Sequence, residues 1–183
     1  MINPYFRLAE AAAGSSSAIG AFYQGQKAVP QAGTYNEGMV AVVGLTSAST
    51  LLRCWTWLLD RDCIPFMTTA FGDVFFWNPA CGVCYLDVQR GEVEFIDSEI
   101  EWFLQDFLVN SEIVAEVLRK DRFEELAKKK GPLKYHQVFI LEPWACLGGK
   151  DAVENYSVGD CGVYLDLIGQ ALQPERKQVH WIK

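Results

Sequence analysis

Three short runs of residues that favour β-structure follow one another in the middle of the chain, and they constrain the fold more than any other feature. The runs are Gly72–Trp77, Val83–Val88 and Glu92–Ile96, and turn-forming residues at 78–79 and 89–91 separate them. Strands joined by connections this short pair antiparallel, because a parallel pair needs a crossover of about a dozen residues or more. We therefore predict a three-stranded antiparallel meander.

The third run indicates how this meander should face water. Glu92 and Glu94 alternate with Val93 and Phe95, and alternate residues of a strand point to opposite faces of a sheet. We expect the two glutamates to face solvent and the two apolar side chains to pack inside.

Helical periodicity follows the meander. Ser98 and Glu101 form a capping box, and Asp97 adds negative charge at the predicted start of a helix. Two further helices are expected at about residues 111–120 and 121–131. The first helix has an apolar face with the spacing of an amphipathic helix, formed by Ile100, Phe103, Leu104, Phe107 and Leu108.

The flanking segments complete the expected fold. Residues 2–12 are weakly helical, and residues 14–37 are rich in Gly, Ser, Ala and Gln without a period, which is typical of a loop. Met39–Leu45 is expected to be a buried strand, after which Thr46 or Ser47 caps a helix. That helix should end at Leu59, and the expected later elements are a strand at Tyr135–Leu141, a loop at Pro143–Gly159, a helix at about Val163–Leu172 and a tail from Pro174.

These elements predict the α+β class, with an antiparallel β-meander sheet packed against several α-helices. The chain has 183 residues, of which 50% are apolar, and this suits one compact unit with a sizeable core. The longest apolar run, Met39–Val43, is far shorter than the roughly 20 residues that cross a bilayer, and the N-terminus lacks the basic start of a signal peptide. We therefore expect a cytoplasmic protein whose six cysteines remain free thiols.

The charge of the chain is concentrated in one segment. The net charge is −7, and Gly91–Glu125 contains eleven acidic residues but only three basic ones. A field of this sign repels nucleic acid and attracts basic partners. The sequence leaves open the alternative that these carboxylates are only the solvated faces of helices.

No pattern in the sequence predicts a catalytic, metal or cofactor site. Cys81 and Cys84 have CxxC spacing, but they open a strand, where no helix dipole lowers a thiol pKa, and no second ligand pair accompanies them for zinc. His136 and His180 are the only histidines, and neither lies in a recognisable catalytic frame. The glycines before Lys150 lack the spacing of a phosphate-binding loop. We interpret the cysteines as packing residues.

Two tryptophans are candidates for recognition of a partner. Trp77 ends a predicted strand, and Trp144 follows Pro143 at the start of a loop. Large aromatic side chains at loop rims are common anchors of protein interfaces. Core filling is the alternative role for both.

Several sequence blocks resemble a known family. They are residues 64–77 (IPFMTTAFGDVFFW), 85–91 (YLDVQRG), 131–135 (GPLKY), 142–143 (EP), 147–149 (LGG) and 163–168 (VYLDLI). On these blocks, the chain resembles the immunity proteins of type VI secretion DNase effectors, in which an immunity C-terminal domain often follows a GAD-like segment. The resemblance implies a GAD-like-related segment at 1–63, the immunity-protein domain at 64–173 and a tail at 174–183. A looser likeness exists to the SMI1/KNR4-type immunity superfamily.

The resemblance implies a function as well. Such a protein binds a cognate toxin, here a nuclease effector, in the producing cell and occludes its active site or DNA-binding surface, with no catalytic residues of its own. The acidic segment fits this role, since a nuclease must offer a basic surface to DNA. We expect no nucleic-acid or membrane partner, and the oligomeric state stays open.

Two other classes of function stay open: a non-catalytic regulatory adaptor or scaffold with the same fold, and a small enzyme that uses Cys81 and Cys84 or His136.

We interpret Phe71–Asp73 as a turn with a local cap. The predicted toxin-binding residues are Glu92, Glu94, Glu99 and Asp106, with Asp73, Trp77 and Trp144 as secondary anchors.

Overall fold

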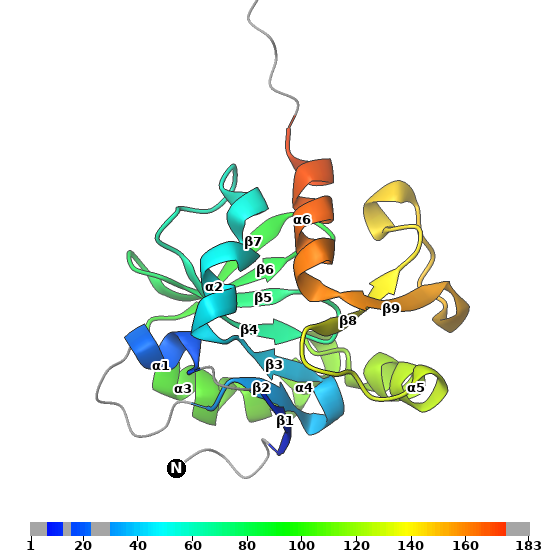
Figure 1. Ribbon diagram of the computed structural model, residues 1–183, viewed down its shortest axis with the longest axis horizontal. Coiled ribbons are helices and arrows are strands. Elements are labelled where there is room, and N and C mark those ends of the chain that lie inside the picture. Colours follow the sequence, from blue (N-terminus) through cyan, green and yellow to red (C-terminus); the bar gives the residue numbers. More distant parts are fainter. Residues whose placement is uncertain (1–6, 13–15, 23–29, 175–183) are drawn as a thin grey trace, which may run out of the picture.

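The computed structural model describes residues 7–12, 16–22 and 30–174, and a seven-stranded antiparallel sheet forms its centre (Figure 1). The strands lie side by side in chain order, so that each strand pairs with the strands before and after it in the sequence. The predicted α+β class is confirmed. The strands are β1 (Leu8–Ala11), β2 (Gly33–Tyr35), β3 (Val40–Val42), β4 (Ile64–Thr69), β5 (Val74–Asn78), β6 (Gly82–Asp87) and β7 (Glu92–Asp97), and the 3-10 turn η1 (Asn36–Gly38) joins β2 to β3.

The predicted meander is confirmed as the last three strands of this sheet. Trp77 of β5 lies opposite Val83 of β6, and Val83 lies opposite Asp97 of β7. Side chains alternate across the sheet, so Phe75 faces one side and Phe76 the other. Both phenylalanines are buried, and the sheet therefore has two covered faces.

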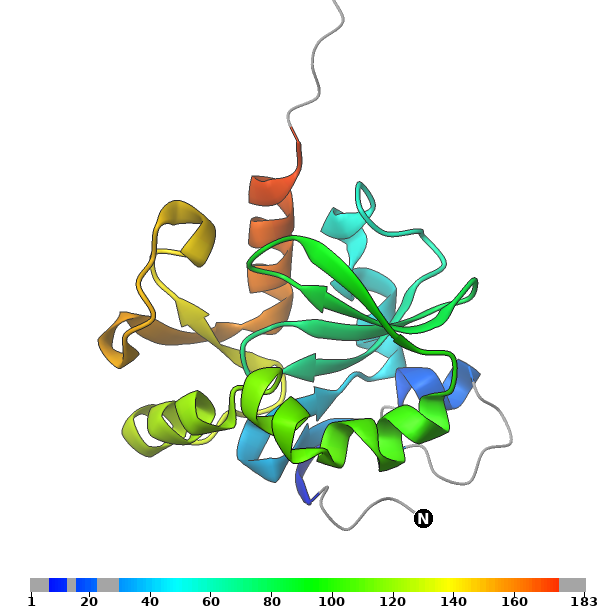
Figure 2. The ribbon, with the colours of Figure 1, turned by 180° about the vertical axis from the view of Figure 1, so that it is seen from behind.

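The helices that follow the meander cover one face (Figure 2). The apolar stripe predicted for residues 100–108 is buried here, and the ring of Phe103 lies 4.8 Å from that of Phe75 between centroids. This layer joins the strands to one apolar core. Its elements are α3 (Ile100–Gln105), the 3-10 turn η3 (Phe107–Val109) and α4 (Ser111–Glu116), and α5 (Lys120–Lys130) follows them beside the sheet (Figure 2), where the Phe123 ring lies 6.2 Å from that of Phe139.

The opposite face carries α2 (Leu45–Leu51), the 3-10 turn η2 (Arg53–Trp55) and α6 (Cys161–Leu172) (Figure 1). Trp55 is fully buried, and its indole N–H donates to the backbone oxygen of Leu165 at 3.1 Å. This contact fixes the last helix to a turn 110 residues earlier. No helix in the described ranges is both long and apolar enough to cross a membrane.

A two-stranded sheet beside the main one is formed by β8 (Gln137–Leu141) and β9 (Tyr156–Asp160) (Figure 1). The N–H of Phe139 donates to the backbone oxygen of Ala70 at 2.7 Å, which ties β8 to the turn after β4. The predicted strand before residue 142 is confirmed, but the loop expected at Pro143–Gly159 is wrong at its end, where β9 forms. The same segment also contains the 3-10 turns η4 (Ala145–Leu147) and η5 (Val153–Asn155).

The N-terminal expectations are wrong where the structure describes the residues. Residues 8–11 form β1 and not a helix, and the expected loop at 14–37 contains α1 (Ala18–Phe22) and β2. All four residues of β1 are exposed, so this strand has no apolar alternation for a sequence pattern to reveal. Gly33 of β2 permits β1 to approach closely, since a Cβ at Gly33 would lie 2.1 Å from the backbone oxygen of Glu10. The other residues of both expectations lie outside the described ranges, as does the tail beyond Pro174.

The helix expected after the strand at 39–45 is shorter than predicted. Gly44, and neither Thr46 nor Ser47, is its N-cap residue, and α2 ends at Leu51. The chain then tightens into η2. The expectation that this helix continues to Leu59 is therefore wrong, although its apolar side still packs against α6.

The start of α3 also differs from the prediction. Glu99 is the N-cap residue, and its side chain makes no capping hydrogen bond, so the capping box of Ser98 and Glu101 is wrong. Asp97 lies two residues before the N-cap residue, and its Oδ1 accepts a hydrogen bond of 2.7 Å from the N–H of Glu99. This Asx-type turn directs the chain from the edge of the sheet into the helical layer.

Candidate partner-binding surface

Most of the acidic segment folds into β7, α3, η3 and α4, which follow one another along one side of the molecule (Figure 2), and its last residues begin α5. Between Gly91 and Leu118 the chain has eight carboxylates and no lysine or arginine. Six of these eight residues are exposed, and Asp97 and Glu101 are half-buried. We call the eight residues the acidic surface: Glu92, Glu94, Asp97, Glu99, Glu101, Asp106, Glu112 and Glu116.

The strand part of the acidic surface lies at the edge of the sheet. Glu94 is opposite Tyr85, and Glu92 is opposite Asp87. The ring of Tyr85 lies 5.0 Å from that of Phe75, on the face that α3 covers. By alternation, both glutamates point to the α3 side. The predicted residues Glu92, Glu94, Glu99 and Asp106 are therefore exposed on elements of the same side.

The expectation that Val93 and Phe95 pack inside is wrong. Val93 is 40% exposed and Phe95 is 59% exposed. Both follow the correct alternation and point to the α6 side, opposite Leu86 and Cys84. However, β7 is the outermost strand, and the helices on that face do not cover it. The strand is exposed on both faces from Glu92 to Phe95.

The cations that follow the acidic surface in sequence are engaged elsewhere. Lys120 pairs with Glu124 at 3.7 Å, and Arg122 pairs with Glu125 at 2.7 Å. Arg119 turns inward, as described below. Among the described residues, no ion pair reaches the acidic surface. Its carboxylates are thus available to a partner's cations.

Asp73, which was expected to be a secondary anchor, is buried. Its Oδ2 lies 3.0 Å from Nη2 of Arg119 and accepts from Thr69 Oγ1 at 3.2 Å, while its Oδ1 accepts from the N–H of Val88 at 3.3 Å. Arg119 has a φ of 51° and lies 3.8 Å above the Phe71 ring. Burial raises the pKa of the Asp73 carboxyl, and the guanidinium opposes this rise. The anchor role of Asp73 is wrong. The turn at Phe71–Asp73 is confirmed, but its local cap is Thr69, whose Oγ1 accepts hydrogen bonds from the N–H groups of Phe71 and Asp73, so the cap expected of Asp73 is wrong.

Trp77 and Trp144 are both half-buried and lie at different ends of the meander. Trp77 is opposite Val83 at the start of β6. Next to Trp144, the N–H of Ala145 donates to Oε1 of Gln89, which follows the end of β6. Six residues of strand separate these points by about 20 Å. The two tryptophans therefore do not form one anchor site together.

Two exposed aromatic side chains on the same elements as the acidic surface were missed. Trp102 of α3 is 42% exposed, and its ring lies 5.9 Å from that of Phe107. The sequence held a signal for Trp102, since it falls outside the buried stripe of its helix. It held none for Phe95, because alternation assigned that residue to the core. Exposed aromatics beside charged groups are typical of interface anchors.

The buried thiol of the cysteine pair, Cys84, is not activated. The Sγ atoms of Cys81 and Cys84 lie 3.5 Å apart, and burial raises the pKa of Cys84 to about 12. A thiol with this pKa is protonated at neutral pH and is a poor nucleophile. Within the described residues, no three His, Cys, Asp or Glu side chains are grouped to hold a metal ion.

His136 lies near a serine, but at a distance that does not suit activation of its hydroxyl. Its Nε2 is 3.5 Å from Oγ of Ser47, which is long for activation of a nucleophile. The recess that both line, with Cys161 and other residues, measures about 10 Å³, which is about the space of one water molecule. His180 lies outside the described residues.

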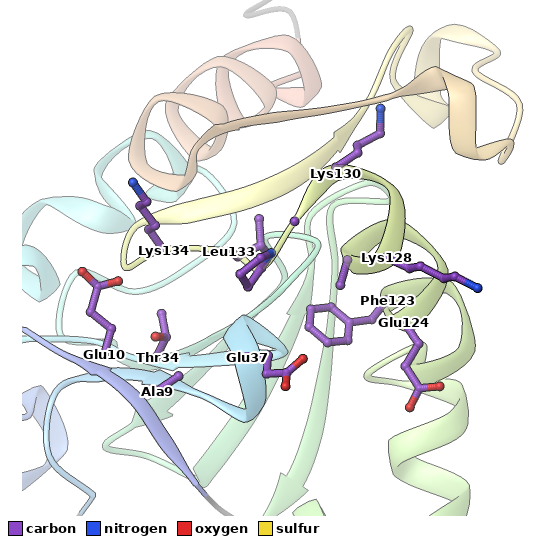
Figure 3. Close-up of a pocket in the computed structure, with 13 residues that line it drawn as sticks. Ala9, Glu10, Thr34, Glu37, Phe123, Glu124, Lys128, Lys130, Leu133 and Lys134 are labelled. Carbon is purple, nitrogen blue, oxygen red and sulfur yellow. The ribbon is translucent and has the colours of Figure 1, made fainter.

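A larger recess of about 820 Å³ lies between the N-terminal strands and α5 (Figure 3). Phe123 forms part of its wall, and the ammonium groups of Lys128 and Lys130 point away from it (Figure 3). The hydroxyl of Thr34 is buried without a hydrogen-bond partner among the described residues, so its oxygen is closed to a ligand. The recess lacks the converging polar groups of a typical small-molecule site.

Comparisons with known proteins agree with the resemblance noted above. Residues 97–171 match the family described as the C-terminal domain of the T6SS immunity protein Tdi1, and this match confirms the resemblance to a type VI secretion immunity protein over that part of the chain. No curated protein matches significantly. A crystal structure of Atu4351 from Agrobacterium tumefaciens is similar, with a TM-score of 0.55 and 19% identity, over 75% of this chain and 69% of that chain. At this identity the likeness shows the fold alone.

Proposed function

We propose that this chain is an immunity protein that binds a cognate type VI secretion nuclease in the cytoplasm of the producing cell and blocks it stoichiometrically, without catalysing a reaction. The observation that carries the proposal is the acidic surface. Six of its eight carboxylates, from Asp97 to Glu116, lie inside the segment that matches the immunity family.

The electrostatics of the acidic surface suit a nuclease as the partner. A nuclease holds the phosphates of DNA with lysine and arginine side chains. Carboxylates that have no cation of their own can take the place of those phosphates, and their field attracts the partner before contact. Occlusion of a DNA-binding surface needs no active site in the inhibitor.

Co-expression in a bacterial host tests this proposal. The first step is to search the genes beside that of this chain for an effector with a nuclease domain. That effector is the probe, and the controls are the nuclease alone and a catalytically inactive nuclease. We expect this chain to restore growth and to co-purify with the nuclease in a 1:1 complex. Unchanged toxicity in cells that contain the chain in soluble excess would overturn the proposal.

The mass of the nuclease separates an inhibitor from an enzyme. A binder leaves the nuclease covalently unchanged and protects only when it is at least equimolar. An enzyme that modifies the nuclease would change its mass and would protect at much lower ratios. We expect an intact mass after co-expression, and activity that returns when the complex is unfolded and the nuclease alone is refolded.

A further inference from the structure

Within the part of the chain that the structure describes, the outer edge of β7 is open. β7 is the last strand of the seven-stranded sheet and pairs with β6 alone. Among the described residues, no further strand pairs with it. An edge strand presents unpaired N–H and C=O groups at every second residue, and another chain can pair with them. β7 is also six residues long, whereas the opposite edge strand, β1, has four residues and an irregular register.

The two sides of β7 differ in chemistry. Glu92 and Glu94 point to the α3 side, while Val93 and Phe95 point to the α6 side. All four residues are exposed. A strand added at this edge would therefore meet carboxylates along one face and apolar side chains along the other.

We propose that the partner docks on β7 by strand addition, and that the added segment carries lysine or arginine at alternate positions with apolar residues between them. This inference rests on the proposed function, because the basic partner is the nuclease. The backbone of β7 would supply affinity, and its alternating side chains would select the segment. The remaining carboxylates on α3 and α4 would contact the body of the nuclease around that segment.

A second copy of this chain is a poor occupant of the same edge. If two β7 strands paired, Glu92 and Glu94 of one copy would lie beside the same glutamates of the other. Like charges in opposed positions destabilise a strand pair, and charged side chains on edge strands are a common device against self-association. The charge of β7 thus favours a basic segment over self-pairing.

Amide hydrogen exchange, followed by NMR in the complex with the catalytically inactive nuclease, tests strand addition directly. In the free protein, the N–H groups of β7 that bond to β6 should exchange slowly and the outward ones quickly. We expect the outward N–H groups to become at least about tenfold slower in the complex. Binding through side chains alone would leave them fast, and this result would overturn strand addition while the proposed function stands.

A proline scan provides a second readout. Exchange in the free protein identifies which of Val93 and Glu94 has the outward N–H, and Val93→Pro or Glu94→Pro then removes that donor without breaking a bond to β6. The variant should melt like the wild type and bind the nuclease at least about tenfold more weakly. Ala9→Pro, at the register irregularity of the opposite edge strand, is the matched control and should bind normally. Normal binding by the β7 variant would overturn the inference, and so would a dimer of the free chain that this proline abolishes. If the wild-type chain also fails to bind the nuclease, the proposed function is overturned as well.

Discussion

Asp73 and Arg119 join the sheet to the connection between α4 and α5. The aspartate is 2% exposed, whereas the side chain of Arg119 is 33% exposed. The two partners should therefore respond differently to removal, because a buried charge without its counter-ion costs far more than a charge that can turn toward solvent.

Arg119→Met should lower the free energy of unfolding by about 3 kcal/mol at neutral pH, since Asp73 stays buried without its cation. Asp73→Asn should cost less. Burial already raises the pKa of Asp73, and loss of the guanidinium raises it further, above the unfolded value of about 3.9. The penalty is then small below about pH 4 and grows as the pH rises toward the native pKa. Thermal melts at pH 4 and pH 8 should show the larger deficit at pH 8; an equal deficit at both would contradict this account.

Cys84→Ser should reduce stability and leave binding intact. Cys84 is 3% exposed and belongs to the core beside α2 and α6. A serine hydroxyl buried there without a partner costs about 1–3 kcal/mol. The melting temperature should fall while the affinity for the nuclease stays the same at a temperature where both proteins are folded. A variant that keeps the wild-type melting temperature but loses toxin neutralisation would refute the packing role.

For single residues, the sequence predicted contacts between neighbours in the chain better than contacts between distant residues. The turn at Phe71–Asp73 could be predicted because its bonds join residues close in sequence. The ion pair with Arg119 could not, since it joins residues 46 positions apart and depends on the left-handed backbone of Arg119. The burial of Asp73 followed from that contact and was missed with it.

The elements that carry the acidic surface, β7 and α3, yield a kinetic prediction. A variant with Glu92, Glu94, Glu99 and Asp106 all changed to lysine should fold, because these residues are exposed. It should bind the nuclease more slowly, and its association rate should lose most of its dependence on salt, since screened attraction would no longer speed the encounter. Stopped-flow association at several ionic strengths measures both effects.

A matched control separates position from net charge. Asp60, Asp62, Glu142 and Glu154 are exposed, and no described ion pair includes them. Changing these four to lysine alters the net charge by the same amount and should affect the association rate far less. Equal slowing in both variants would mean that overall charge, and not the acidic surface, drives association.

Strong periodicity made some elements predictable and its absence hid others. The stripe from Ile100 to Leu108 was predicted correctly because a one-sided helix repeats its apolar residues. The strands β1 and β2 have four and three residues, too few for a pattern. The exposure of Phe95 could not be predicted for a different reason. Alternation along a strand indicates which face of the sheet a side chain is on, but it does not indicate whether a helix covers that face.

The whole molecule has one continuous sheet across the boundary at residue 63 that the family resemblance implied. Val40 and Val42 of β3 lie opposite Thr69 and Met67 of β4, and both valines are fully buried. The N-terminal strands thus supply part of the core around which the later helices pack.

A truncated chain of residues 64–174 should therefore fail to fold as a stable unit. Its β4 would become an open, apolar edge, and the core would lose Tyr35, Val40 and Val42. We expect an aggregated or molten product without a cooperative thermal transition. The full chain, prepared in the same way, is the control. A cooperative melt of the truncated chain near the temperature of the full chain would show that the two segments are independent domains.

Titration of the purified nuclease with this chain, with DNA cleavage as the readout, tests whether the chain is a stoichiometric inhibitor. If the carboxylates of the chain occupy the DNA-binding surface of the nuclease, cleavage should fall linearly and end near one equivalent of wild-type chain. The variant with lysine at Glu92, Glu94, Glu99 and Asp106 should need a clear excess. Full nuclease activity at a tenfold excess of folded wild-type chain would contradict the account.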